Sequence, residues 1–200
     1  MRILTIFLFF VVSLLPVSAQ KRASVKQTQQ MVNTISRSAQ NVKTMSGNFT
    51  QTTKASYLDE PAISLGKMNY SSNGNLLWQY TSPFNFTFQV TNGKAFLKSG
   101  KKTKEIDLKS SANIQKIATM VQGSITGKNL RNNKDFSVVM FVNGNVWIAK
   151  LTPKKPQMKK YIKSVSLYFD KTKQIINKVQ MYQMSGDEVT IEFKDVKVTR

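Results

Sequence analysis

Two pairs of carboxylates are the side chains of this sequence that could carry acid–base chemistry. Glu105 and Asp107 stand two residues apart, so that on a β-strand both would point to the same face. Asp187 and Glu188 are adjacent and follow Gly186 in a segment that has the composition of a turn. Carboxylates become general acid and base when their surroundings separate the two pKa values. Neither pair lies in an apolar stretch, and we interpret both as solvated surface groups among lysines.

The composition excludes most other catalytic chemistry. The 200 residues include no histidine and no cysteine, so the commonest general base and the thiolate nucleophile are both absent. A hydrolase triad is implausible without histidine, and the sequence has no serine in a nucleophile elbow and no glycine-rich phosphate loop. We therefore predict that the protein is not an enzyme and that it holds no metal and no cofactor.

Bulky apolar side chains gather instead in residues 66–98. Between residues 84 and 90, phenylalanine or valine stands at every second position, with polar residues between. This alternation predicts a strand with one apolar face, and residues 68–70 and 76–80 show the same spacing. Together the three segments present one apolar face, which is either a packed core or the wall of a cavity.

Residues 1–19 have the pattern of a secretory signal peptide. A basic start precedes an apolar run over residues 3–15, which is shorter than the roughly 20 residues of a membrane span, and Val-Ser-Ala precedes Gln20. We expect cleavage after Ala19, which leaves residues 20–200 as a single domain in the periplasm. An uncleaved anchor is the weaker alternative. With no lipobox cysteine, the mature chain is expected to be soluble and without a lipid anchor.

The chain is strongly basic, with 30 Lys and Arg against 10 Asp and Glu. Without Arg2 in the signal segment, the mature charge is 29 − 10 = +19. Such a charge attracts polyanions, but export argues against nucleic acid. The remaining interpretations are an anionic membrane surface or acidic partner protein, and lysines that simply solvate strand faces.

Two segments have helical periodicity, with apolar residues three or four positions apart. The first covers residues 23–43 and the second residues 113–121, where Gly123 and Gly127 surround the end. Their apolar stripes are Val25, Val32, Ile35, Ala39 and Val42 in the first, and Ile114, Ile117, Ala118 and Val121 in the second.

About ten strands fill the rest of the chain, and Asn-Gly pairs at 73–74, 92–93 and 143–144 predict tight hairpin turns between some of them. The predicted strands are residues 44–54, 63–70, 76–80, 84–90, 94–98, 104–108, 136–142, 146–151, 161–169, 175–184 and 189–198. A sheet of this size curls and needs its open side covered. We predict a mainly β fold with helices (α+β), an unclosed antiparallel half-barrel under a helical lid.

An ordered set of short motifs resembles the LolA-type outer-membrane lipoprotein carriers. These motifs are TMSGNFTQ at 44–51, GKM at 66–68, LWQY with Pro83 at 77–83, VTNGK at 90–94, WIAKLTP at 147–153 and the strand at 186–193. The resemblance covers most of the mature chain. It implies a periplasmic protein that takes acylated lipoproteins from an inner-membrane ABC transporter, holds their acyl chains and delivers them toward the outer membrane, where a receptor takes them over.

The resemblance also implies that the apolar face is an acyl-chain site and that the helices form its lid. The expected cavity wall consists of Phe49, Met68, Tyr70, Leu76, Trp78, Tyr80, Phe86, Phe88 and Val90, and the expected lid residues are Ile35, Ile114 and Ile117. Many family members carry an arginine at the position of Ser72, and this arginine forms a hydrogen bond to the lid. Control of the lid by that arginine is therefore not carried over to this chain. We expect a monomer.

Two other functions remain open. A periplasmic sensor or interaction module of the same fold would bind a membrane regulator, or another envelope lipid, and would need no acylated cargo. An enzyme acting on an envelope lipid or glycolipid would depend on the carboxylate pairs.

Overall fold

A computed structural model describes residues 20–111, 115, 122–123, 127, 130–131 and 134–200. The predicted signal peptide and almost all of the predicted second helix, including Ile114 and Ile117, lie outside these residues.

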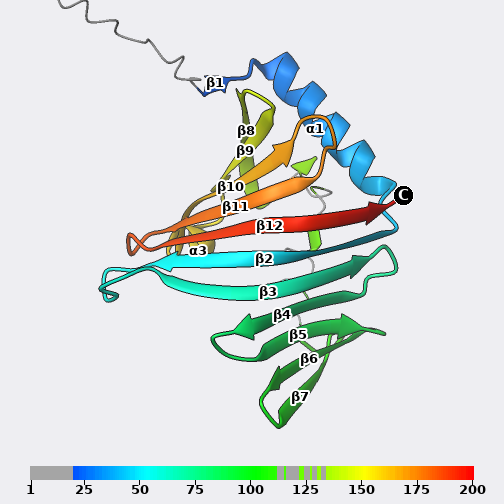
Figure 1. The fold of residues 1–200 in the computed structure, drawn as a ribbon. Coiled ribbons are helices and arrows are strands. Elements are labelled where there is room, and N and C mark those ends of the chain that lie inside the picture. Colours follow the sequence, from blue (N-terminus) through cyan, green and yellow to red (C-terminus); the bar gives the residue numbers. More distant parts are fainter. Residues whose placement is uncertain (1–19, 112–114, 116–121, 124–126, 128–129, 132–133) are drawn as a thin grey trace, which may run out of the picture.

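One antiparallel sheet of twelve strands forms the body of the described chain (Figure 1). Its spatial order is β1-β8-β9-β10-β11-β12-β2-β3-β4-β5-β6-β7, so β1 and β7 are the two edge strands of the described sheet, and the sheet does not close. The predicted fold class, an open half-barrel with helices, is confirmed. The strands are β1 (Lys21–Arg22), β2 (Thr44–Lys54), β3 (Ala62–Ser71), β4 (Leu76–Ser82), β5 (Phe86–Thr91), β6 (Lys94–Ser99), β7 (Lys102–Asp107), β8 (Phe136–Asn143), β9 (Val146–Pro153), β10 (Ile162–Asp170), β11 (Ile176–Gln183) and β12 (Glu188–Thr199).

Apart from shifts of one or two residues at strand ends, the structure differs from the predicted strands and connections at three places. Strand β5 begins at Phe86 and not at residue 84, because Pro83 has no N–H for the ladder and 83–85 form the connection from β4. Strand β1 was not predicted, since two exposed basic residues carry no strand pattern. Between β9 and β10, where the sequence predicts neither a strand nor a helix, Pro156–Lys159 forms the short helix α3, with proline at the helix start.

Helix α1 (Val25–Gln40) begins at a capping box, in which the Ser24 hydroxyl accepts from the Gln27 amide and the Gln27 side chain accepts from the Ser24 amide. Its buried residues are Met31, Val32, Ile35, Ser36 and Ala39. Val25 was predicted in the apolar stripe but is 90% exposed, because it stands in the first turn, ahead of the part that packs on the sheet. The predicted helix is otherwise confirmed, with its ends two to three residues shorter.

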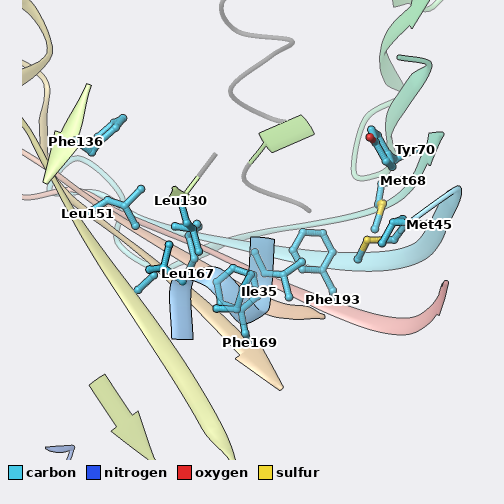
Figure 2. Close-up of a cluster of buried hydrophobic side chains, with 14 of the residues drawn as sticks. Ile35, Met45, Met68, Tyr70, Leu130, Phe136, Leu151, Leu167, Phe169 and Phe193 are labelled. Atoms are coloured by element: carbon cyan, nitrogen blue, oxygen red, sulfur yellow. The ribbon is translucent and has the colours of Figure 1, made fainter. Parts of the chain in front are cut away.

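The inner face of the sheet, the one that α1 packs against, carries the core. Residues directly opposite each other on paired strands share a face, and the registers place Met140, Ala149 and Leu167 in one row and Met45, Tyr70 and Leu76 in another. Figure 2 shows these two parts of the core, one around Ile35, Leu130, Leu167 and Phe169, the other at Met45, Met68 and Tyr70. No helix among the described residues is long and apolar enough to cross a membrane.

Candidate functional site

Strands β2 to β5 bring all nine expected wall residues onto the inner face. Met68, Trp78 and Phe88 are direct cross-strand partners in one row. The row on one side of it contains Tyr70, Leu76 and Val90, and the row on the other side contains Phe49, Gly66, Tyr80 and Phe86. The period-2 alternation in the sequence therefore produces one continuous apolar surface over four strands.

The aromatic rings of this surface contact one another in defined geometries. Phe49 stacks on Trp78 with ring centroids 4.3 Å apart and meets Tyr80 edge to face at 5.3 Å. Trp78 also meets Phe193 of β12 edge to face at 6.1 Å, so the surface continues across β2. Stacked and edge-to-face pairs of this kind add stabilisation beyond that of the apolar area that they bury.

Exposure divides the nine residues into two groups. Phe49, Met68, Leu76 and Val90 are at most 5% exposed, and Tyr70 is 9% exposed. Trp78, Tyr80, Phe86 and Phe88 are only partly buried. The first group therefore packs as core in the structure, and the second group is the part of the inner surface that a bound molecule could reach.

Polar groups lie at one end of this surface. The Tyr80 hydroxyl donates to Gln51 Oε1 at 2.8 Å, and Gln51 Nε2 donates to the Thr53 hydroxyl at 3.3 Å. At the other end, burial raises the pKa of the Tyr70 phenol above its ordinary value. Among the described residues of β2 to β5, these hydroxyl and carboxamide groups lie at the two ends of the apolar surface.

The second half of the inner surface, on β8 to β12, was not among the predicted site residues. Its buried members are Phe136, Met140, Ala149, Leu151, Leu167, Phe169, Ile176 and Phe193. Ile35 of α1 lies against Phe169 at Gly127, where an added Cβ would be 2.5 Å from Ile35 Cγ2 and 3.0 Å from Phe169 Cε1. The alternation of apolar and polar residues in 136–142 and 189–193 could have identified this half of the surface. Its apolar side chains are aliphatic more often than aromatic, so the pattern is typical of an ordinary core.

A hollow of about 380 Å³ lies at the ends of β2 to β5 near the β3–β4 turn. Its lining includes Tyr70, Leu76 and Val90, one row of the expected wall, together with outer-face residues such as Asn69 and Leu77. The hollow is therefore in contact with one row of the expected cavity wall.

The carboxylate pairs lie on the surface. Glu105 forms an ion pair with Lys94, and both side chains are half exposed. Glu188 accepts from Gln180 Nε2 at 2.7 Å and from the Thr190 hydroxyl at 3.1 Å, and the Gln180 contact, with nearby Lys54 and Lys178, lowers the pKa of Glu188. Over the described residues, no group of His, Cys, Asp or Glu has the arrangement of a metal site.

Ser72 lies exposed in the β3–β4 turn, and its amide donates to the Lys43 carbonyl at 2.8 Å. Two residues further on, Gly74 accepts a hydrogen bond of 2.9 Å from Gln122 Nε2. A carboxamide from the later part of the chain therefore reaches this turn.

Comparisons with known proteins agree with this architecture. Residues 40–200 match the family model described as outer membrane lipoprotein carrier protein LolA. No curated protein matches the chain.

Several solved structures resemble the fold at low sequence identity. A chain of the Pseudomonas aeruginosa MucA/MucB complex has a TM-score of 0.50 and 9% identity, over 86% of this chain and 57% of that one. The LolA superfamily protein NE2245 from Nitrosomonas europaea has a TM-score of 0.40 and 11% identity, covering 84% and 94%. A putative outer membrane lipoprotein-sorting protein domain from Vibrio parahaemolyticus has a TM-score of 0.46 and 11% identity, over 85% of this chain and 91% of that one. At such identities the likeness concerns the fold.

Proposed function

Because this chain belongs to the LolA family of outer membrane lipoprotein carrier proteins, we propose that it holds lipoprotein acyl chains on its inner apolar surface and carries them across the periplasm. The observation that carries the proposal is the group of partly buried aromatic side chains in two neighbouring rows, Trp78, Tyr80, Phe86 and Phe88, beside buried core residues of the same face. Saturated chains need an apolar surface with few polar groups, and the polar groups of this surface lie at its ends.

The energetics require that such a carrier bury its cargo incompletely. An acyl chain gains about 0.8 kcal/mol for each methylene removed from water, so full burial of several chains would exceed the roughly −20 kcal/mol at which non-covalent affinities saturate. A carrier must also release its cargo. Half-exposed rings provide contact on one side of a chain only, which limits the gain.

Export and partners belong to the same proposal. Residues 1–19 direct the chain to the periplasm and are removed, residues 20–200 form the carrier domain, an inner-membrane ABC transporter loads it, and an outer-membrane receptor unloads it. Ile35, Ile114 and Ile117 are proposed as lid residues. The carboxylate contacts are consistent with a binding protein that performs no catalysis.

The test is to purify the chain from Gln20 onward from the periplasm and to identify co-purifying molecules by mass spectrometry. The proposal predicts triacylated lipoproteins and displacement of a fluorescent fatty acid by them. Folded protein that yields neither result contradicts it. Recovery of a membrane regulator without acylated cargo supports the interaction-module alternative instead.

A further inference from the structure

Exposed apolar side chains concentrate at one rim of the sheet. Of the described large hydrophobic residues, those exposed are Val25, Tyr57, Ile63, Leu65, Phe84, Tyr161, Tyr182 and Met184. Apart from Val25, all lie near the end where β2, β4 and β11 finish and β3, β5 and β10 begin. The opposite rim carries polar turns such as Asn73-Gly74 and Asn143-Gly144.

A basic segment occupies part of this apolar rim. Five of the ten residues 154–163 are lysine and none is acidic. Within it Tyr161 is 71% exposed, and Met184 of the β11–β12 turn is 56% exposed. The Met184 amide donates to the Tyr161 carbonyl at 3.0 Å, so the two residues are neighbours. We name Lys159, Lys160, Tyr161, Lys163 and Met184 the basic rim patch; α3 and the β11–β12 turn both lie at the left of Figure 1.

The backbone of the patch is held by hydrogen bonds. The amides of Met158 and Lys159 donate to the Lys155 carbonyl, and the Tyr161 amide donates to the Met158 carbonyl at 3.1 Å. Lys155 is fixed by an ion pair with Asp135. Side chains on an ordered turn lose less freedom on binding than those on a mobile one.

Most of the charge of the patch is uncompensated. In the described part of the chain, Lys159, Lys160 and Lys163 form no salt bridge, whereas Lys155 pairs with Asp135. Residues 184–187, which connect β11 and β12, contain one acidic residue, Asp187, and its side chain is only partly exposed. Three exposed cations around two exposed apolar side chains make a surface that is both basic and amphipathic.

We propose that the basic rim patch docks onto the surface of an anionic bilayer, with the lysines at the lipid phosphates and Tyr161 and Met184 in the interfacial region. Charge complementarity favours this occupant, since each lysine close to an anionic leaflet strengthens binding. The apolar side chains stand on turns beyond the strand ends, and tyrosine is favoured at the boundary between water and lipid. The patch lies at the rim of the sheet, on α3, the first residues of β10 and the β11–β12 turn, so this docking does not depend on acyl cargo.

The experiment measures binding of the chain from Gln20 onward to vesicles of phosphatidylethanolamine and phosphatidylglycerol, and to vesicles of phosphatidylcholine alone, by sedimentation. Binding is expected only to the anionic vesicles and should weaken as salt is raised. The triple variant K159Q/K160Q/K163Q should bind about 100-fold more weakly, from roughly fivefold per lysine.

Two matched controls distinguish binding by the patch from an effect of net charge and from non-specific binding through exposed aromatic side chains. K43Q/K171Q/K173Q removes the same charge from exposed positions at the opposite rim and should bind as the parent does. Tyr161→Ala should weaken binding, whereas Tyr57→Ala should not, because Tyr57 is similarly exposed but lies beside Asp59 and Glu60. Circular dichroism confirms that each variant is folded.

Equal losses in both triple variants would mean that net charge acts without the patch, and would overturn the proposal. The same conclusion follows if neutral vesicles bind equally well, or if an acidic protein is retained by the patch while vesicles are not. Fatty-acid displacement measured on the same variants reports on the carrier proposal separately, because these substitutions lie outside the inner surface.

Discussion

The ring of Phe49 lies directly over the backbone of Gly66, its cross-strand partner on β3. A Cβ at Gly66 would be 2.2 Å from Phe49 Cζ and 2.4 Å from the Gln79 carbonyl oxygen. The absence of a side chain lets the ring settle onto the sheet, where its other contacts are Trp78 and Tyr80. Glycine in a strand interior often marks such a close approach, and here it determines the arrangement of the aromatic surface.

Replacing Gly66 with alanine is therefore expected to destabilise the fold. The added methyl overlaps both a ring and a backbone oxygen, and overpacking of a core typically costs about 1–3 kcal/mol. Urea unfolding followed by circular dichroism measures the loss. The double variant Gly66→Ala/Phe49→Leu keeps the clash with Gln79 but relieves the one with the ring, so it should lose less than the sum of the two single variants. Additive losses would show that the ring contact is not the cause.

Ile35 is expected to be the most sensitive residue of α1. It is fully buried against Phe169 and Gly127, and truncation of a buried isoleucine to alanine typically costs about 2–5 kcal/mol. Val25→Ala on the same helix is the control, because a side chain that is 90% exposed loses almost no burial. Thermal or urea unfolding compares the two, and a similar small loss in both would mean that α1 contributes little to the core.

The sequence predicts the strands well because their apolar and polar residues alternate strictly and their turns carry Asn-Gly pairs. Residues 44–54 are one strand with the predicted ends. The predictions fail where the structure depends on strand pairing or on where a helix meets the sheet. Lys21 and Arg22 form a strand only because Val142 and Phe141 lie opposite them, and Val25 leaves the apolar stripe only because of where the helix meets the sheet.

For the candidate site, alternation identifies which residues share a face but not how deeply each one is covered. Met68 and Trp78 are cross-strand partners on that face, yet Met68 is fully buried and Trp78 is not. Depth depends on what lies above each row, such as the Phe49 ring, which comes from another strand. A single sequence holds no local signal for such a contact.

Glu188 should make stability depend on pH. Hydrogen bonds from Gln180 and Thr190 lower its pKa below the ordinary value of 4.5, so its contribution is present above about pH 4.5 and is lost as the pH falls through the lower folded-state value. Glu188→Gln should reduce stability near neutral pH by less than about 1 kcal/mol, since the group is partly solvated. The difference from the parent should shrink in acid.

Urea midpoints measured from neutral pH down to about pH 3 test this expectation. Glu192→Gln removes the same charge from an exposed position of β12 and provides the reference. If the Glu188→Gln difference stays constant over the whole range, the hydrogen bonds do not favour the ionised carboxylate.

Phe88 and Phe96 offer the sharpest test of the inner surface as the acyl-binding wall. Both are partly buried phenylalanines on the neighbouring strands β5 and β6, but Phe88 faces inward beside Trp78 and Leu97, whereas Phe96 is paired with Gln89 and Glu105 on the outer face. An acyl chain on the inner surface would contact one ring and not the other. Burying a phenylalanine against a ligand contributes about 1.5 kcal/mol or more, so Phe88→Ala should weaken binding of a fluorescent fatty acid by roughly tenfold. Phe96→Ala should leave the dissociation constant unchanged while costing comparable stability, and equal weakening by both substitutions would place the acyl chain elsewhere.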